Sequence, residues 1–473
     1  MGAPDRRLEA FGSQVAAWLS PVVGTATTTS VERLSGGASR QSFVVTLTTA
    51  SGERKVVVQR KRSGGLGARL LDEAALVEIA GRSGVRVPTV LAATDDPSVV
   101  GGEALAVDFV TGESLAPVIL RDDAWRTARQ ILPGQAAAAL AHIGQITTTD
   151  ERLRWLRTDD PLTLIDALHH GLGRAQPVIE LGLRWLAAHR PPAVADRVVH
   201  GDFRLGNLMV DPHDGLVAVL DWELAHLGDP VEDLAWACVK AWRFGSDAPA
   251  LGLCGIDHWV DLWVSGGGDR PDRHRLLWWL VYGTLRWAVI CELQVAAHLS
   301  GLAPSVELAV LGRRVAESEH DLLVLLGALD LSGVPDGEVA PVGDAGGSSV
   351  EPPHDAPGVD DLLGVVESYL RNDVPGATTG QVRFHGRVAA NAVGIVRRQL
   401  ADAGQAGHRH QARLEALGFA SDGGLADALR SGRLDDRLDE IGAVLGPSVV
   451  DKLRVANPGY LLTPSADPWS TAE

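Results

Sequence analysis

Short runs of alternating apolar and polar residues, separated by glycine and serine, characterise the N-terminal part of the chain. β-Branched residues fill Ser42–Thr48 and Lys55–Gln59, which predicts two strands. Arg69–Ser83 places apolar residues at helical spacing and ends at Gly84, which predicts a helix. A short apolar strand is expected over Leu105–Val110. Together these elements predict a small, sheet-rich lobe over residues 1–110.

The pattern then changes, and Leu, Ala and Trp recur at helical spacing over most of residues 111–332. Two short β-rich segments, 197–199 and 216–220, interrupt it. These features predict a mainly helical second lobe with a hairpin-like insert. Residues 333–358 are rich in Gly, Pro, Asp and Ser, with almost no large apolar side chain, so we expect a linker there.

The last segment, residues 359–473, returns to helical spacing. Leu362, Val365, Val366 and Tyr369 fall at i, i+3, i+4 and i+7, which is typical of an amphipathic helix. We expect an independent, small all-α domain here and assign it no chemistry. The predicted fold class is therefore α+β: an antiparallel-sheet lobe, a helical lobe and a C-terminal helical domain.

Composition narrows the functional classes. The chain has 473 residues, of which 45% are hydrophobic and 22% charged, as is ordinary for a globular protein. Its net charge of −17 argues against a nucleic-acid partner, because phosphate backbones are bound by a surplus of Lys and Arg. The longest apolar run, Leu276–Leu285, ends at Arg286 and is far shorter than the roughly 20 residues of a membrane helix, so no membrane span is expected.

The cysteines indicate the compartment. Cys238, Cys254 and Cys291 lie apart without the paired spacing of a zinc site, so we expect reduced, mostly buried thiols. Residues 1–20 contain no sustained apolar region or cleavage signal. Both features predict a cytoplasmic protein.

Two short motifs in the helical lobe carry candidate catalytic residues. Val198–Asn207 contains Asp202 and Asn207, and Val217–Glu223 contains Asp221. Transfer of a phosphoryl group from a nucleotide needs a group that orients the attacking hydroxyl and oxygen ligands for Mg²⁺. Asp202, Asn207 and Asp221 supply these groups in the right order. Each motif alone would also fit an ordinary turn, but the strand-like residues before both aspartates favour delivery of the carboxylates to one cleft.

The sequence HGDFRLGN followed by LDWE resembles the catalytic and metal loops of the aminoglycoside phosphotransferase and choline kinase superfamily. It is most similar to the branch that includes kinase-like domains fused to acyl-CoA dehydrogenases. The resemblance implies a bilobed, protein-kinase-like fold, in which Asp202 is the catalytic base and Asn207 and Asp221 are Mg²⁺ ligands. It further implies that the segment around Asp229 and Asp233 braces the helical lobe. His200 should brace the loop by hydrogen bonding, since Asp202 already fills the role of base.

The same resemblance assigns a glycine-rich turn to the nucleotide. Gly36, Gly37 and Ser39 lie between two β-rich segments, where glycine lets backbone N–H groups approach phosphate oxygens. An ordinary hairpin turn would have the same composition. By the resemblance, Asp108 and Val110 lie at the connection between the lobes, where their backbone groups would bind adenine, although a simple buried strand is the competing interpretation.

Strand alternation puts Val56, Val58 and Arg60 on one face of the second strand. We therefore expect Val58 to line the base pocket and Arg60 to contact the phosphates, with Glu73 as the partner of Arg60. Kinase families usually have Lys in this position, so this sequence departs from the pattern. The alternative is a solvated basic strand end.

These features predict a phosphotransferase that uses ATP, or alternatively GTP, with Mg²⁺. The acceptor would be a hydroxyl of a small molecule, such as a hydroxyacyl thioester or another lipid-derived metabolite. Specificity would arise in the helical lobe, where Trp278, Trp279 and Tyr282 form either a pocket or, as we favour, part of the core. The alternative function is a catalytically silent, nucleotide-binding interaction protein. The sequence does not fix the oligomeric state.

Overall fold

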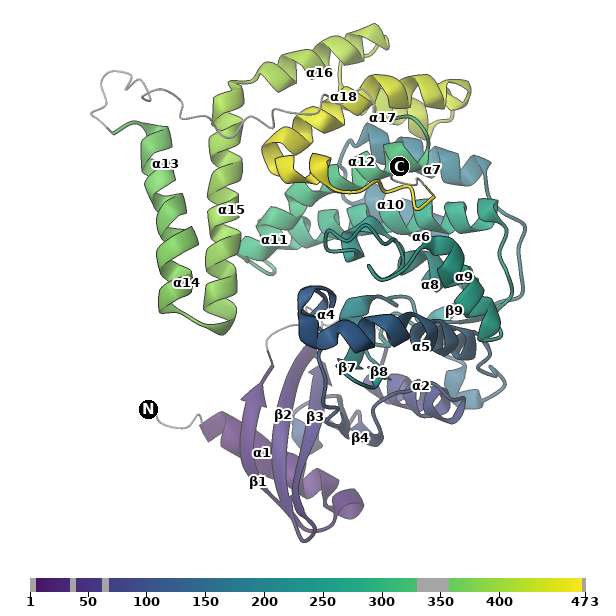
Figure 1. Cartoon of the computed structure of the whole chain (residues 1–473), viewed down its shortest axis with the longest axis vertical. Helices are drawn as coiled ribbons and strands as arrows, with labels where there is room; N and C mark the ends of the chain where they lie inside the picture. Colours follow the sequence, from purple (N-terminus) through teal and green to yellow (C-terminus); the bar gives the residue numbers. More distant parts are fainter. Residues whose placement is uncertain (1–5, 35–39, 62–67, 330–356, 470–473) are drawn as a thin grey trace. The chain divides into compact units, whose positions relative to one another are not determined.

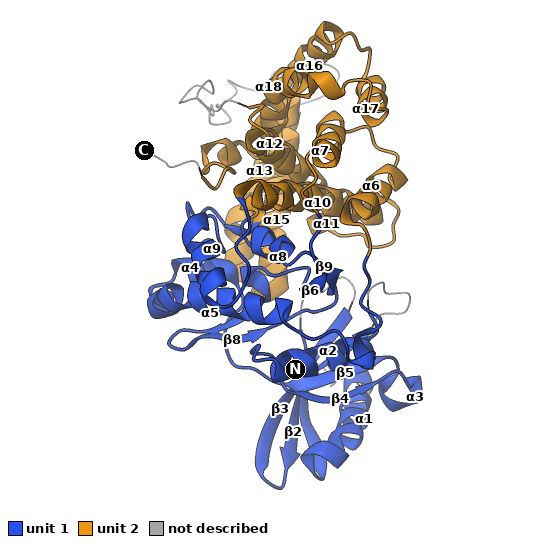
Figure 2. Cartoon of the chain, turned by 90° about the vertical axis from the view of Figure 1, so that its right-hand side faces the viewer, with its two compact units in different colours: residues 1–158, 193–238, 242–272 blue, residues 159–192, 239–241, 273–473 orange. Residues whose placement is uncertain are grey.

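The computed structural model describes residues 6–34, 40–61, 68–329 and 357–469, which form two compact units (Figure 1, Figure 2). Unit 1 comprises residues 1–158, 193–238 and 242–272, and unit 2 comprises residues 159–192, 239–241 and 273–473. In this division the sheet lobe shares a unit with the catalytic motifs, and the expected domain boundaries after residues 110 and 332 stay a prediction. The expected linker, 333–358, lies almost entirely outside the described residues.

Unit 1 begins with a helix and a five-stranded antiparallel sheet of order β1-β2-β3-β5-β4 (Figure 1). The strands expected around residues 42–48, 55–59 and 105–110 and the helix expected over 69–83 are all present. The elements are α1 (Arg6–Val23), β1 (Ala26–Arg33), β2 (Arg40–Thr49), β3 (Gly52–Lys61), α2 (Leu70–Arg82), β4 (Val90–Thr94), α3 (Pro97–Val100) and β5 (Ala104–Asp108).

Helix α1, which was not among the elements predicted from the sequence, covers one face of this sheet. Its residues Phe11, Val15 and Leu19 are buried against β2 and β3. On β3 the side chains of Val56 and Val58 point into this core and are fully buried. Because side chains alternate along a strand, the odd-numbered residues of β3 face the opposite side.

The rest of unit 1 carries the two motifs on short strands. The expected hairpin-like insert is two separate two-stranded pairs: β6 pairs with β9, and β7 pairs with β8. The elements are α4 (Ala116–Arg121), α5 (Arg126–Gly144), β6 (Arg197–Val199), β7 (Leu208–Asp211), β8 (Gly215–Val219), β9 (His226–Gly228), α8 (Val231–Trp236) and α9 (Ile256–Ser265).

Unit 2 is helical in its described residues. It combines helices of the second lobe with the C-terminal helices, and α17 and α18 pack on α7 and α12. The elements are α6 (Pro161–Gly171), α7 (Pro177–Ala188), α10 (Arg273–Leu299), α11 (Val306–Leu311), α12 (Val315–Leu325), α13 (Val359–Ser368), α14 (Val374–Ala377), α15 (Gly380–Asp402), α16 (Gln405–Ala416), α17 (Asp422–Arg430) and α18 (Leu438–Ala456).

Helix α10 forms the centre of unit 2. Trp278, Trp279 and Tyr282 are buried in it, which confirms that this aromatic group belongs to the core. By length and composition α10 could cross a membrane, but 72% of its most apolar window is buried inside the protein, as expected for a core helix. All three cysteines are free thiols, and Cys238 and Cys291 are buried, as predicted.

Candidate active site

The loop after β6 is held by a carboxylate of helix α8. Asp233 accepts hydrogen bonds from the backbone N–H groups of His200 at 2.6 Å and Gly201 at 2.9 Å. Burial, reinforced by neighbouring Glu232, raises the pKa of Asp233 to about 7, although the two N–H donors act in the opposite direction. Gly201 has a φ of +82°, and a Cβ there would clash with the carbonyl oxygen of Leu224. Asp233 therefore braces this loop, as expected, through direct hydrogen bonds to its backbone.

His200 connects the two motifs. Its Nε2 donates to the carbonyl oxygen of Leu220 at 3.0 Å, and its Nδ1 accepts from the backbone N–H of Asp202 at 3.2 Å. Complete burial lowers its pKa to about 4, so the imidazole is neutral at physiological pH. The structure therefore confirms that His200 braces the loop.

Asp202 is fixed by three side-chain donors. Trp236 Nε1 donates to it at 2.8 Å, Asn207 Nδ2 at 2.7 Å and Arg204 Nε at 3.1 Å. Two of these donors, Trp236 and Arg204, were given no role from the sequence. Together these donors hold the carboxylate in one orientation.

Asp221 follows β8 and lies close to the first motif. The backbone N–H of Leu220 donates to the carbonyl oxygen of Asn207 at 2.8 Å, which joins the two loops. Asp221 has a φ of 66°, an uncommon conformation for a residue other than glycine. Burial, followed by the charge of Glu223, raises its pKa to about 7, while Arg40 opposes the shift.

The arrangement of these groups suits a hard divalent cation. The hydrogen bonds of the Asn207 side chain to described residues both use Nδ2, so its carbonyl oxygen can face a cation. Asp221 is a partly buried carboxylate among other carboxylates, where an added positive charge would be stabilised. These two oxygen ligands match the one or two protein ligands that Mg²⁺ commonly takes.

The basic partner of Glu73 differs from the expectation. Glu73 on α2 is bound by Arg40, the first residue of β2, through Nη1 at 2.9 Å and Nη2 at 2.6 Å. Arg40 Nε also lies 3.0 Å from Glu223. Burial alone would lower the pKa of Arg40, but the carboxylates of Glu73 and Glu223 outweigh it and raise that pKa. The expected Arg60–Glu73 pair was therefore wrong.

Arg60 and Val58 do share a face, as predicted, but it is the face covered by α1. The Arg60 guanidinium lies over the rings of Phe11 and Phe43, at 5.2 and 5.7 Å from their centroids. Val58 is fully buried in the core behind them. The assignment of both residues to the nucleotide side was wrong, because helix α1, which the sequence pattern did not predict, covers this face.

The remaining nucleotide-site predictions are untested. Gly36, Gly37 and Ser39 lie outside the described residues. Asp108 ends β5, and its side chain accepts two hydrogen bonds from Arg54 Nη2 and one from Nε. The proposed adenine contacts of Asp108 and Val110 involve backbone groups and stay a prediction.

With this geometry established, residues 30–279 match the model of the phosphotransferase enzyme family. The chain belongs to this family. Residues 376–460 match a second family, a domain of unknown function numbered 6285. The sequence resemblance stated above is thereby confirmed, and the helical segment after the kinase-like part has a family of its own.

Curated relatives and a solved structure agree with this family assignment. Mouse acyl-CoA dehydrogenase family member 10 is 28% identical over 64% of this chain and 29% of its own length. Mouse family member 11 is 30% identical over 30% of this chain and 19% of its own length. The chain thus spans less than a third of these relatives. A structure from Ralstonia eutropha, assigned as an aminoglycoside phosphotransferase, aligns with a TM-score of 0.52 at 22% identity, covering 65% of this chain and 95% of the other. This similarity confirms the kinase-like fold.

Unit 2 contains a second group of buried charges. His169, His170 and Glu180 offer ligand atoms within 4.8 Å of one another, as a metal site would. However, Arg430 of α17 donates to Glu180 at 2.6 Å and to His170 at 2.8 Å. Burial would lower the pKa of His169, but the carboxylates of Glu180 and Glu292 raise it to about 9. A protonated imidazole and a guanidinium therefore balance two carboxylates, and we interpret the group as an ion network between α6, α7, α10 and α17.

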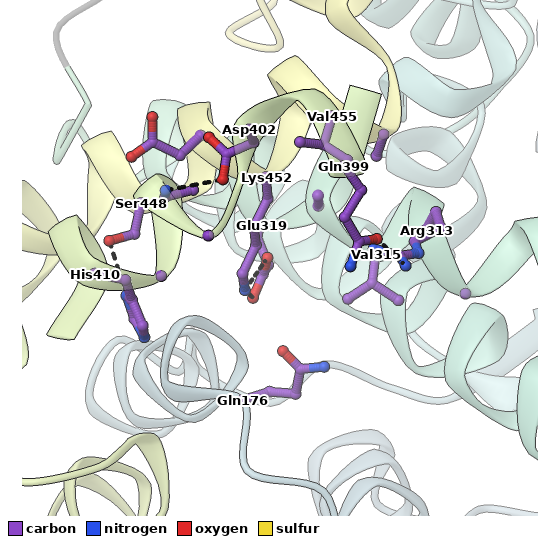
Figure 3. A pocket seen from close by; sticks show the side chains of 17 residues that line it. Gln176, Arg313, Val315, Glu319, Gln399, Asp402, His410, Ser448, Lys452 and Val455 are labelled. Atoms are coloured by element: carbon purple, nitrogen blue, oxygen red, sulfur yellow. Dashed lines mark hydrogen bonds and ion pairs between the residues drawn. The ribbon is translucent and has the colours of Figure 1, made fainter. Parts of the chain in front are cut away.

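Unit 2 also holds a pocket of about 550 Å³ between α12, α15, α16 and α18 (Figure 3). Lys452 bonds both carboxylate oxygens of buried Glu319 at 2.9 Å, and His410 Nδ1 lies 2.9 Å from Ser448 Oγ. The polar groups that line this pocket are thus largely paired with one another. They join the helical lobe to the C-terminal helices.

We predict that Gly201→Ala strongly reduces activity, because the new Cβ meets the Leu224 carbonyl and the residue must keep a positive φ. Phosphoryl transfer should fall by roughly 100-fold or more, on the scale of a misplaced reacting group. Steady-state assays would measure this. Gly255→Ala, at a glycine with no atom within 4 Å of a new Cβ, is the control and should keep full activity. Equal rates for both variants would contradict the proposed constraint.

A second prediction concerns pH. The folded-state pKa of His169, about 9, lies above its ordinary value of 6.5, so its contribution to stability is complete below pH 6.5 and is lost as pH rises through 9. The melting temperature of the wild type should fall over this range, and the His169→Gln variant should lack that part of the fall. His274→Gln, at an exposed histidine, is the control. An unchanged pH slope in His169→Gln would refute this account.

Proposed function

We propose that this protein is an ATP- and Mg²⁺-dependent phosphotransferase that acts on a hydroxyl of a small molecule. The observation that supports this most strongly is the joining of Asp202, Asn207 and Asp221 within one unit that matches the phosphotransferase family. Short strands, a buried histidine and Asp233 hold the loops before any ligand arrives. Such preorganisation is what in-line phosphoryl transfer requires, because positioning and charge neutralisation supply most of the acceleration.

In this proposal Asp221 and the carbonyl oxygen of Asn207 hold the metal. Mg²⁺, when bound, would neutralise the charge of the nucleotide phosphates. Asp202 orients the acceptor hydroxyl and receives its proton. The donors from Trp236 and Arg204 keep its carboxylate aimed in one direction. Asn207 thus contributes both to the metal site, through its carbonyl oxygen, and to the orientation of Asp202, to which its Nδ2 donates a hydrogen bond.

The surroundings of Asp202 bear on the acceptor. Arg204 lies next to it, with the guanidinium 4.8 Å from the ring centroid of Trp242. A cationic acceptor would meet this guanidinium on its approach to Asp202, whereas an anionic acceptor would be attracted. We therefore propose a neutral or anionic acceptor. A hydroxyacyl thioester of coenzyme A, which carries phosphates, has this chemistry and is consistent with the names of the curated relatives.

The competing function is a nucleotide-binding protein without turnover. It is favoured by the departure from the lysine that kinases usually have on β3, since Gln59 occupies the helix-α2 side of that strand beside Arg40. The two functions differ in turnover, so a broad panel of hydroxyl metabolites with labelled ATP and GTP separates them. Binding without phosphorylation of any metabolite would favour the silent protein.

We predict that Asp202→Asn lowers the transfer rate by roughly 10²- to 10⁴-fold, the usual contribution of a general base, while nucleotide affinity stays near that of the wild type.

Asp221→Asn should instead weaken Mg²⁺-dependent nucleotide binding, by more than the roughly tenfold that loss of an outer-shell partner costs. Calorimetry and product assays would distinguish the two effects. Asp214→Asn, at an exposed turn, is the matched control. Full turnover in Asp202→Asn would rule out its role as the base.

The acceptor proposal gives a further prediction. Among acceptors matched in size, the wild type should show the highest kcat/KM for those with a negative charge near the hydroxyl. Arg204→Gln should reduce the ratio of anionic to neutral kcat/KM by about tenfold, the scale of one charge-assisted hydrogen bond. Arg204→Lys, which keeps the charge, should retain most of this ratio. A preference for polyamine acceptors in the wild type would contradict the proposal.

A further inference from the structure

Arg40 is a buried cation in a region otherwise rich in carboxylates. Its side chain is 8% exposed, and that of its partner Glu73 is 3% exposed. On its other side lie Glu223 and, by its electrostatic effect on Arg40, Asp221. Arg40 therefore connects helix α2 of the sheet lobe to the loop that carries the proposed metal ligand.

The orientation of the guanidinium is determined from two directions. Glu73 binds Nη1 and Nη2 in a two-pronged contact, and Gln59 of β3 accepts from Nη1 at 3.1 Å. These contacts use the two terminal nitrogens, Nη1 and Nη2, which form the outer edge of the guanidinium. The inner edge, at Nε, points to Glu223 at 3.0 Å, beside Asp221. The residue is held rigidly on one side and faces the proposed metal site on the other.

We propose that Arg40, from strand β2, is the cation that contacts the nucleotide phosphates, and that Gln59 and Glu73 position it. This inference rests on the proposed function. When a nucleotide binds, its phosphates replace Glu223 as the partner of the Nε edge, while the contact with Glu73 persists. A planar guanidinium suits this double role, because it can bind a carboxylate and a phosphate through different edges.

The register of the sheet explains why the cation is on β2. Arg40, Ser42 and Val44 alternate with Phe43 and Val45, which point into the core under α1. The even-numbered side chains of β2 and the odd-numbered ones of β3 thus share the face toward α2. Ser42 pairs with Gln59 across the strands, so Gln59 lies diagonally beside Arg40. A lysine at position 59 would reach the same space, whereas Arg60 lies on the face covered by α1.

Calorimetric titration of ADP·Mg²⁺ into the full chain tests this inference without relying on turnover. Loss of Arg40 alone would leave Glu73 as a buried, unpaired carboxylate, so the test variant is Arg40→Gln/Glu73→Gln, which removes both charges. We expect its affinity to fall by roughly 10- to 100-fold, as for one lost charge-assisted hydrogen bond or more. The swap Arg40→Gln/Gln59→Lys returns a cation to β3 beside Glu73 and should recover most of the affinity.

Arg60→Gln is the matched control from the other face and should bind ADP·Mg²⁺ like the wild type. Circular dichroism verifies that each variant is folded. If the Arg40→Gln/Glu73→Gln variant binds as tightly as the wild type, or if Arg60→Gln is the weaker binder, the inference is wrong while the proposed function stands. If the variants lose affinity only in proportion to their loss of stability, Arg40 is only structural. If the wild type binds no nucleotide, the proposed function fails and this inference with it.

Discussion

The stability of unit 1 depends on how the charges of four carboxylates within one small region are compensated. Asp202, Asp221, Glu73 and Glu223 influence one another electrostatically, and Asp221 is partly buried. Like charges at such distances raise the free energy of the folded state unless cations or hydrogen-bond donors compensate. Arg40 compensates Glu73 and Glu223, and Arg204, Trp236 and Asn207 compensate Asp202. Asp221 has the weakest compensation, which is the physical reason to propose it as a metal ligand.

The loops around these groups are rigid for a similar reason. Asp233 binds consecutive backbone N–H groups, and His200 uses both ring nitrogens in bonds to the two motifs. Gly201 permits the close approach of the Leu224 backbone. The cost of folding strained and buried polar segments is thus offset by hydrogen bonds that fix the catalytic geometry in advance. In an enzyme of this family, that geometry lets binding energy act on the reacting groups.

The C-terminal helices extend the helical lobe. Arg430 binds Glu180, Arg184 binds Asp435, and Lys452 binds Glu319, so charged contacts join α17, α18 and the short turn between them to α7 and α12. Glu180 and Glu319 are nearly inaccessible, and a buried carboxylate that lost its partner would be costly. The domain of unknown function therefore contributes to the charge balance of the helices on which it packs.

The sequence by itself determined the fold class, the strands and helices around the motifs, and the family, because short motifs and periodicity are local properties of the chain. It also pointed to Asp202, Asn207 and Asp221 as candidates, since their order along the chain corresponds to the roles proposed for them. It could not decide which face of β3 meets the nucleotide side. The pairing of Val58 with Arg60 on one face was correct, but only the packing of α1 shows that this face is covered. Likewise, the pairs Arg40–Glu73 and Asp202–Trp236 join residues that are 33 and 34 positions apart. Such contacts depend on strand register and helix packing, which are set by the whole tertiary structure.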